Sequence, residues 1–253
     1  NKNLFAQAIL ITLPFTAFSY YYFSGKWRWV FAAIGCLGLF TIFLTQSRTA
    51  ILAFVIGAIT TLFLWKKTDF KIKKTTFINK ALPIFLTITI LAVSIFIFIY
   101  KNKNTKQILN YNSISERVVL WKKSFSMSLA HPFTGVGTGN WKINLPQYGI
   151  GELNREARIG EMHYQNPEND FIWVFSENGI LGGFFYILIF ISAIYHCIKL
   201  YNKIENRDLK IYSVCLFFGL ICYAVISFFS FPKERIFHLV CFAVMLSSVT
   251  SLH

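Results

Sequence analysis

Long apolar blocks constrain this sequence more than any other feature. A bilayer core about 30 Å thick is crossed by roughly 20 apolar residues in a helix, and seven stretches of the chain are long and apolar enough to do so. They lack the strict alternation of a β-barrel strand. With 14% charged residues, against about 25% in a soluble domain, the chain is predicted to be an all-α, polytopic helical membrane protein. The blocks are 3–23, 29–45, 49–65, 82–100, 171–198, 210–230 and 236–252.

Basic residues between the blocks predict the orientation of the chain. Alternating crossings place the three breaks that are rich in lysine and arginine on one side, and the positive-inside rule makes that side cytoplasmic. The breaks at 46–48 and 231–235 and the long segment 101–170 then lie on the outer face. This asymmetry accounts for the net charge of +14 without a nucleic-acid partner. The basic breaks are 24–28, 66–80 and 199–210.

The same pattern predicts three regions and an incomplete N-terminus. Four spans fill 1–100, a loop domain fills 101–170, and three spans fill 171–253. The fifth block is longer than one crossing and contains Gly179, so we expect a short interfacial helix that bends into the span. Seven crossings place Asn1 outside without a visible signal peptide, which predicts further spans upstream.

One amphipathic helix is predicted within the outer loop, over residues 115–130. Ser115 is a suitable N-cap, and His131-Pro132 ends the helical pattern. Its apolar residues recur at the three- and four-residue spacing of a single helix face, which we expect to be buried. That stripe consists of Val118, Trp121, Phe125 and Leu129.

Four polar stretches gather on the outer face, each at or beside a predicted helix N-terminus. Arg48 and Arg117 are expected in first turns, where the helix dipole disfavours a cation. An arginine at this position becomes favourable if a phosphate-like dianion binds between it and the free N–H groups of the helix. The stretches are Gln46-Ser47-Arg48-Thr49, Ser115-Glu116-Arg117, Pro167-Glu168-Asn169-Asp170 and Pro232-Lys233-Glu234-Arg235.

Each of these residues also has an interpretation without catalysis. Arg48 is long enough to reach lipid headgroups, and Arg117 suits the solvated side of an amphipathic helix. Arg235 and Glu234 suit an interfacial ion pair, and Glu168 suits a solvated loop. The histidines have no metal-ligand spacing and the carboxylates form no Asp-x-Asp pair, so neither a metal nor another cofactor is expected.

Four segments resemble the superfamily of O-antigen ligases and Wzy-type O-antigen polymerases. The order and spacing of the segments match over nearly the whole chain. They include a serine–arginine motif that opens a span, a loop ending in a G-V-G-x-G-N turn, a motif that the family usually has as H-N-D, and a span break. The segments are TQSRTAILAF, SERVVLWKKSFSMSLAHPFTGVGTGNW, NPENDFIWVFSENGILGG and SFFSFPKERIFHLV.

The resemblance implies a metal-independent membrane glycosyltransferase at the periplasmic face of the bacterial inner membrane. Its donor would be a glycan on undecaprenyl diphosphate, and its acceptor would be lipid A–core, a growing glycan or a protein hydroxyl. Ligase, polymerase and protein O-oligosaccharyltransferase therefore all remain open. Membrane lipids are the expected surroundings of the donor.

The resemblance also assigns roles to individual residues. Arg48 and Arg117 match arginines that hold the diphosphate. Glu168 stands where the family has a histidine that activates the acceptor hydroxyl, so it is the predicted base, with His163 on the same loop as its substitute. The remaining predicted substrate-binding residues are Arg235, Asn169 and Asp170.

Two functions from other classes compete with this interpretation. A transporter or flippase for an anionic lipid or solute would place charges near the membrane midplane and show repeated halves. Here the charges lie at one face and no repeat is visible, which favours an enzyme. A scaffold without catalysis is the third possibility, because the family histidine is replaced by Glu168.

Overall fold

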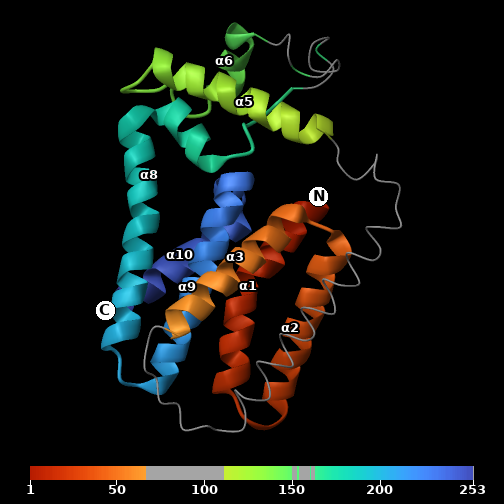
Figure 1. Ribbon diagram of the computed structural model, residues 1–253, viewed down its shortest axis with the longest axis vertical. Helices are drawn as coiled ribbons and strands as arrows, with labels where there is room; N and C mark the ends of the chain where they lie inside the picture. Colours follow the sequence, from red (N-terminus) through yellow and green to blue (C-terminus); the bar gives the residue numbers. More distant parts are fainter. Residues whose placement is uncertain (67–110, 150–152, 154–159, 161–162, 253) are drawn as a thin grey trace.

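The computed structural model describes residues 1–66, 111–149, 153, 160 and 163–252. Every regular element in these ranges is helical (Figure 1), which confirms the predicted all-α class. The predicted span at 82–100 lies outside the described residues. The helices are α1 (Lys2–Tyr22), α2 (Gly25–Thr45), α3 (Arg48–Lys66), α5 (Tyr111–Ala130), α6 (Trp141–Asn144), η1 (Leu145–Tyr148), α8 (Asp170–Lys203), α9 (Arg207–Phe229), η2 (Pro232–Glu234) and α10 (Ile236–Ser251).

Four of these helices have the length and apolar character of membrane spans: α1, α2, α8 and α9. Two further predicted blocks form shorter apolar stretches, Arg48–Leu64 in α3 and Ile236–Ser251 in α10. The chain is therefore a helical membrane protein with four candidate spans in its described part. The total of seven spans, the three-region division and the periplasmic position of 101–170 stay predictions.

The described turns gather at two opposite ends of the helix bundle (Figure 1). The α1–α2 and α8–α9 turns lie at one end. The N-terminus, the α2–α3 turn and the α9–α10 turn lie towards the other, where α5 and α6 cover the bundle. This second end is called the α5 end below. The two groups of turns are those that alternating crossings predicted.

Cysteine labelling would show which end faces the cytoplasm. Ser24 in the α1–α2 turn and Gln165 at the α5 end are both exposed. In spheroplasts, a membrane-impermeant thiol reagent is expected to modify Gln165→Cys and to spare Ser24→Cys, because the basic breaks face the cytoplasm. Inside-out vesicles should reverse the result. Labelling of Ser24→Cys alone in spheroplasts would contradict the orientation.

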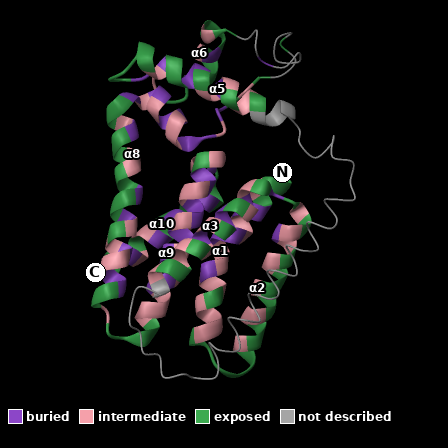
Figure 2. Cartoon of the chain, in the orientation of Figure 1, coloured by how far each residue is buried: buried purple, intermediate pink, exposed green. Residues whose placement is uncertain are grey.

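The larger core forms where α1, α3, α8, α9 and α10 meet. Tyr223 on α9 stacks on Phe242 of α10 with their ring centroids 4.3 Å apart. Gly219 lets α9 approach the same helix, because a methyl group there would lie 2.6 Å from the Met245 sulfur. By contrast, Ile42 is the one buried residue of α2 in the part of the chain that the structure describes, and the rest of the helix is exposed or half-buried (Figure 2). The packing of α9 against α10 holds the turn between them at the α5 end.

Helix α8 consists of two parts, as the length of the fifth block predicted. Gly179 has φ 66° and ψ −167°, outside the helical region, and interrupts the helix. The short first part lies beneath α5, and the longer second part runs down the bundle (Figure 1). The bend therefore brings the residues before α8 under the α5 helix.

Helix α5 differs from its prediction in its start and in its buried face. It already includes Tyr111, so Ser115 lies inside the helix and is not its N-cap. The sequence before Ser115 contains no nearby glycine or proline that would interrupt the helix. The predicted stripe is largely exposed: Phe125 is 63% and Leu129 66% accessible. Met127 on the opposite side is fully buried instead.

A second, smaller core explains which face of α5 is buried. Leu120 and Met127 pack with Trp141 of α6 and Trp173 of α8. The indole N–H of Trp141 donates to the Ser124 hydroxyl at 2.8 Å, inside this core. Two large tryptophans approach α5 from the rest of the chain, and this tertiary packing overrides the helix's own apolar stripe.

Candidate functional site

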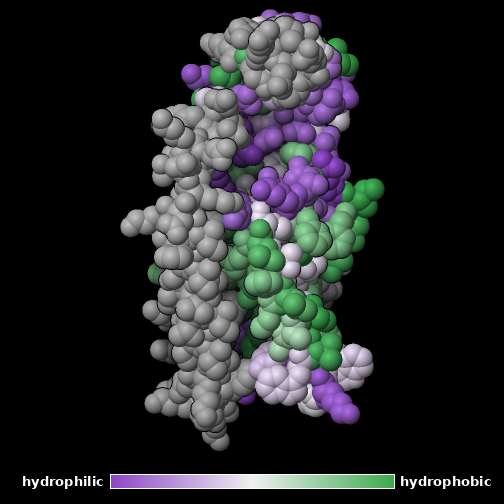
Figure 3. All heavy atoms as spheres, turned by 90° about the vertical axis from the view of Figure 1, so that its right-hand side faces the viewer, coloured by the Kyte–Doolittle hydropathy of each residue, from purple (hydrophilic) through white to green (hydrophobic). Residues whose placement is uncertain are grey.

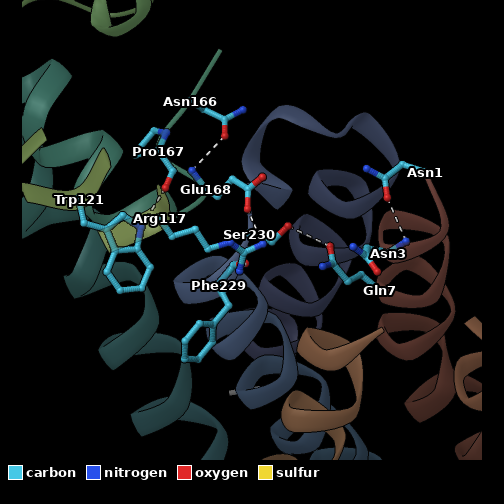
Figure 4. Close-up of polar contacts among 10 residues, drawn as sticks. All are labelled: Asn1, Asn3, Gln7, Arg117, Trp121, Asn166, Pro167, Glu168, Phe229 and Ser230. Atoms are coloured by element: carbon cyan, nitrogen blue, oxygen red, sulfur yellow. Dashed lines mark hydrogen bonds and ion pairs between the residues drawn. The ribbon is translucent and has the colours of Figure 1, made fainter. Parts of the chain in front are cut away.

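The structure joins two predicted site residues that are distant in the sequence. The guanidinium Nη2 of Arg117 forms an ion pair with the Glu168 carboxylate (Figure 4). Its Nη1 donates to the backbone carbonyl of Phe229 at 3.3 Å, so α5, the loop before α8 and the end of α9 meet at one guanidinium. The two side chains keep 29% and 39% of their surface accessible, so a solute can reach the pair.

The loop that carries Glu168 is held in place by hydrogen bonds. Asn166 is buried, and its side-chain oxygen accepts from the Glu168 backbone N–H at 3.0 Å. The Trp121 indole N–H, one turn after Arg117 on α5, donates to the Pro167 carbonyl at 2.9 Å. Glu168 itself has a φ of +53°, a conformation rare for residues other than glycine and typical of constrained sites. Helix α5 therefore contacts this loop through both Arg117 and Trp121.

Asn169 and Asp170 form hydrogen bonds within the protein. Asn169 is the N-cap of α8, and its side chain accepts from the Ile172 N–H at 3.0 Å. The Asp170 carboxylate accepts from the Lys233 backbone N–H at 3.1 Å and from the Tyr186 hydroxyl at 3.4 Å. Both residues are fully buried. They fix the start of α8 against the α9–α10 turn, and their substrate-binding role stays a prediction.

Lys233 is a further candidate site residue. The sequence pattern did not separate it from the other residues of the stretch 232–235. Its ammonium lies 3.4 Å from the centroid of the Trp173 ring, in a cation–π contact. Burial lowers the pKa of this lysine, although the carboxylates of Asp170, Glu177 and Glu234 oppose the shift. Its place between an aromatic ring and carboxylates, next to the Asp170 contact, is decided by tertiary structure alone.

The structure also describes the other predicted site residues. Arg48 begins α3, as predicted, and its side chain is exposed at the α5 end. Arg117 is not in a first turn, because α5 starts at Tyr111, so the helix-dipole argument does not apply to it. Arg235 is exposed and stacks 4.9 Å from the Phe231 ring centroid. His163 is exposed on the loop before Glu168.

The surface of the molecule has a hydrophilic layer towards the α5 end. Hydrophilic residues gather between the cap formed by α5 and α6 and the apolar surface of the spans (Figure 3). Beside the ion pair, the Ser230 hydroxyl donates to the Gln7 side-chain oxygen at 3.3 Å (Figure 4). Within the described ranges, no three His, Cys, Asp or Glu side chains come together as a metal site. Cationic recognition of an anion is the chemistry that these side chains support best.

A buried glutamate organises the glycine-rich turn above the site. The Glu177 carboxylate accepts from the backbone N–H groups of Gly139 and Trp141, at 3.0 and 3.2 Å. The backbones touch as well, because a Cβ on Gly135 would lie 2.3 Å from the carbonyl carbon of Glu177. A Cβ on Gly179 would meet the Phe133 carbonyl oxygen at 2.2 Å. The E-x-G motif (177–179) and the G-V-G-x-G motif (135–139) therefore pack closely against each other through their backbones.

Two glycines of this turn allow a matched test. Gly135 and Gly139 both have positive φ, but a Cβ at Gly139 has no neighbour within 4 Å. Gly135→Ala is expected to destabilise the protein by roughly 2–4 kcal/mol, and Gly139→Ala by roughly 1 kcal/mol, because only the first adds a backbone clash to the strained φ. Denaturant titration in detergent, followed by tryptophan fluorescence, measures both. Equal losses of stability in the two variants would show that the Gly135 and Glu177 backbones can separate enough to accept a methyl group.

Comparison with known proteins identifies one matching family model. The family model described as O-Antigen ligase matches residues 31–187, more than half of the 253 residues. The matched region includes Arg48, Arg117 and Glu168. A search of the curated proteins found no match. The matched range contains three of the four sequence segments, and the predicted family is confirmed: the chain belongs to the O-antigen ligase family.

Proposed function

We propose that this protein transfers a glycan from undecaprenyl diphosphate to an acceptor hydroxyl at the periplasmic face of the bacterial inner membrane. Family membership supports glycan transfer in general. The observation that supports the finer proposal is the Arg117–Glu168 ion pair, because it joins the proposed diphosphate-binding cation to the proposed base. The accessible pair lies at the α5 end, where Arg48 also lies.

The proposed reaction is a single displacement at the sugar. The acceptor oxygen attacks the anomeric carbon from the side opposite the diphosphate, and the bond between that carbon and the diphosphate oxygen breaks. The hydroxyl proton passes to the Glu168 carboxylate. Arg117 and Arg48 stabilise the negative charge that develops on the leaving diphosphate, an effect worth several kcal/mol when the groups are preorganised. The anomeric centre is inverted.

The ion pair also suggests an order of events. In the structure, Arg117 is paired with the Glu168 carboxylate. In the proposed reaction this carboxylate accepts the proton. A diphosphate offers the guanidinium more negative charge and bidentate geometry, so donor binding competes with Glu168 for Arg117. The donor would then bind first and release Glu168 for the acceptor. This order prevents Glu168 from acting before the sugar is in place.

Reconstitution with defined substrates tests the proposal. Full-length protein in liposomes would be given an undecaprenyl-diphosphate glycan together with lipid A–core, free glycan or a peptide carrying hydroxyls. Mass spectrometry of the product distinguishes ligase, polymerase and protein glycosylation. Transfer by the wild type, and transfer at least about a hundredfold slower by Glu168→Gln, is the expected result. Movement of intact donor across the bilayer without transfer would instead support the flippase interpretation.

A further inference from the structure

One face of helix α5 carries large apolar side chains that the described protein leaves uncovered. Val118 is 42%, Phe125 63% and Leu129 66% accessible. They share one side of the helix, since they are seven and then four residues apart. The opposite side contains the buried Leu120 and Met127. Helix α5 therefore has two apolar faces, and only one of them belongs to the core that the described residues form.

The uncovered face continues onto a membrane span. Phe133, just beyond α5, is 73% accessible. The neighbouring Pro132 carbonyl accepts the Ile180 N–H at 2.7 Å, which joins this segment to the bend of α8. Ile180 and Leu181 are 54% and 60% accessible and belong to the candidate span α8. The apolar surface thus runs from the side of a span to the helix above it.

The composition of this face suits a bilayer surface better than a protein partner. Lys122 is exposed between Val118 and Phe125 on the same side of α5. A lysine within an apolar stripe can extend its ammonium to lipid phosphates while its stem stays among the acyl chains. α5 also lies across the end of the bundle (Figure 1), the orientation of a helix in the plane of the interface. Continuity with α8 selects lipid as the occupant.

We propose that α5 lies in the interface of the membrane, with Val118, Phe125 and Leu129 among the lipid headgroups and upper acyl chains. Arg117 precedes the first residue of this stripe. The contact therefore holds Arg117 near the depth of lipid phosphates, where a lipid-linked diphosphate presents its charge. This last consequence rests on the proposed function, whereas the membrane contact does not.

Photolabelling of the unmodified protein tests the membrane contact. Wild-type protein in liposomes would be irradiated with a phospholipid that carries a diazirine in its upper acyl chain, and the adducts would be located by mass spectrometry. Phe184 and Phe185 on the span part of α8 are exposed and serve as the internal positive control. Adducts are expected on Phe125 and Leu129 as well. Labelling of α8 without labelling of α5 would overturn the proposal, whether or not the protein transfers glycans.

Kinetics test the positioning of Arg117. The double variant Phe125→Ser, Leu129→Ser is expected to raise KM for the lipid-linked donor several-fold while kcat changes little, because the catalytic groups remain. Ile143→Ser is the matched control, since Ile143 is 65% accessible but lies on α6, away from the stripe. An unchanged donor KM in a folded double variant would refute the positioning role. Failure of the wild type to use the donor would instead count against the proposed function.

Discussion

Replacing Glu168 with glutamine is expected to lower glycan transfer by roughly 10²–10⁴, the usual range for loss of a general base. Glutamine keeps the shape of the side chain but cannot take the hydroxyl proton. The measurement is kcat with a defined undecaprenyl-diphosphate glycan. Full turnover in this variant would place the base elsewhere.

The same variant should bind the donor more tightly. Without a carboxylate, Glu168→Gln leaves the Arg117 guanidinium available to the diphosphate. An accessible ion pair contributes about 0.2–1 kcal/mol, so the donor Kd is expected to fall by up to about fivefold. Lower turnover with tighter binding would separate a catalytic carboxylate from one that only holds Arg117 in position, since loss of a positioning contact should weaken binding.

Restoring the family residue provides the sharper test of Glu168. Glu168→His should retain part of the activity and shift the pH profile towards the histidine range, near a pKa of about 6.5. His163→Ala is measured alongside, because His163 lies on the same loop. If His163→Ala abolishes transfer and Glu168→Gln does not, then His163 is the base.

Loss of the two arginines Arg48 and Arg117 is the second change that should greatly reduce glycan transfer. Arg48→Ala and Arg117→Ala are each expected to reduce kcat by roughly 10²–10³, because each removes a cation that stabilises the leaving diphosphate. Arg48→Lys should cost nearly as much as Arg48→Ala, since lysine keeps the charge but lacks the planar guanidinium fork. Full activity in the double alanine variant would exclude both residues from the mechanism.

Arg207 gives these variants a matched control. Like Arg48, it is the first residue of an apolar helix, but α9 begins at the opposite end of the bundle (Figure 1). Its guanidinium lies 5.7 Å from the Tyr21 ring centroid. Arg207→Ala should leave donor binding and kcat unchanged. A comparable loss in Arg207→Ala would mean that removing any terminal arginine disturbs the bundle, and the losses at Arg48 and Arg117 would then say nothing of the diphosphate.

The sequence alone determined the class of the protein and most of its helices. A helix that crosses a bilayer must be long and apolar, because its backbone has no water to bind, and that requirement is visible in composition. Bounds such as Lys2–Tyr22 and Arg207–Phe229 lie close to the predicted 3–23 and 210–230. The bend at Gly179 and the Asn169 cap were also predictable, because they depend on local backbone chemistry.

Only the tertiary structure decided which helix faces meet and which side chains pair. Lipid and protein interior are both apolar, so the stripe of Phe125 and Leu129 predicted an apolar face but not what covers it. The partnership of Arg117 with Glu168 needs α5 and the loop before α8 to meet, and no local pattern encodes that meeting. The same holds for Lys233, because its position over Trp173 depends on packing between α8 and the α9–α10 turn. The local sequence determines where the helices form, and long-range packing brings the site residues together.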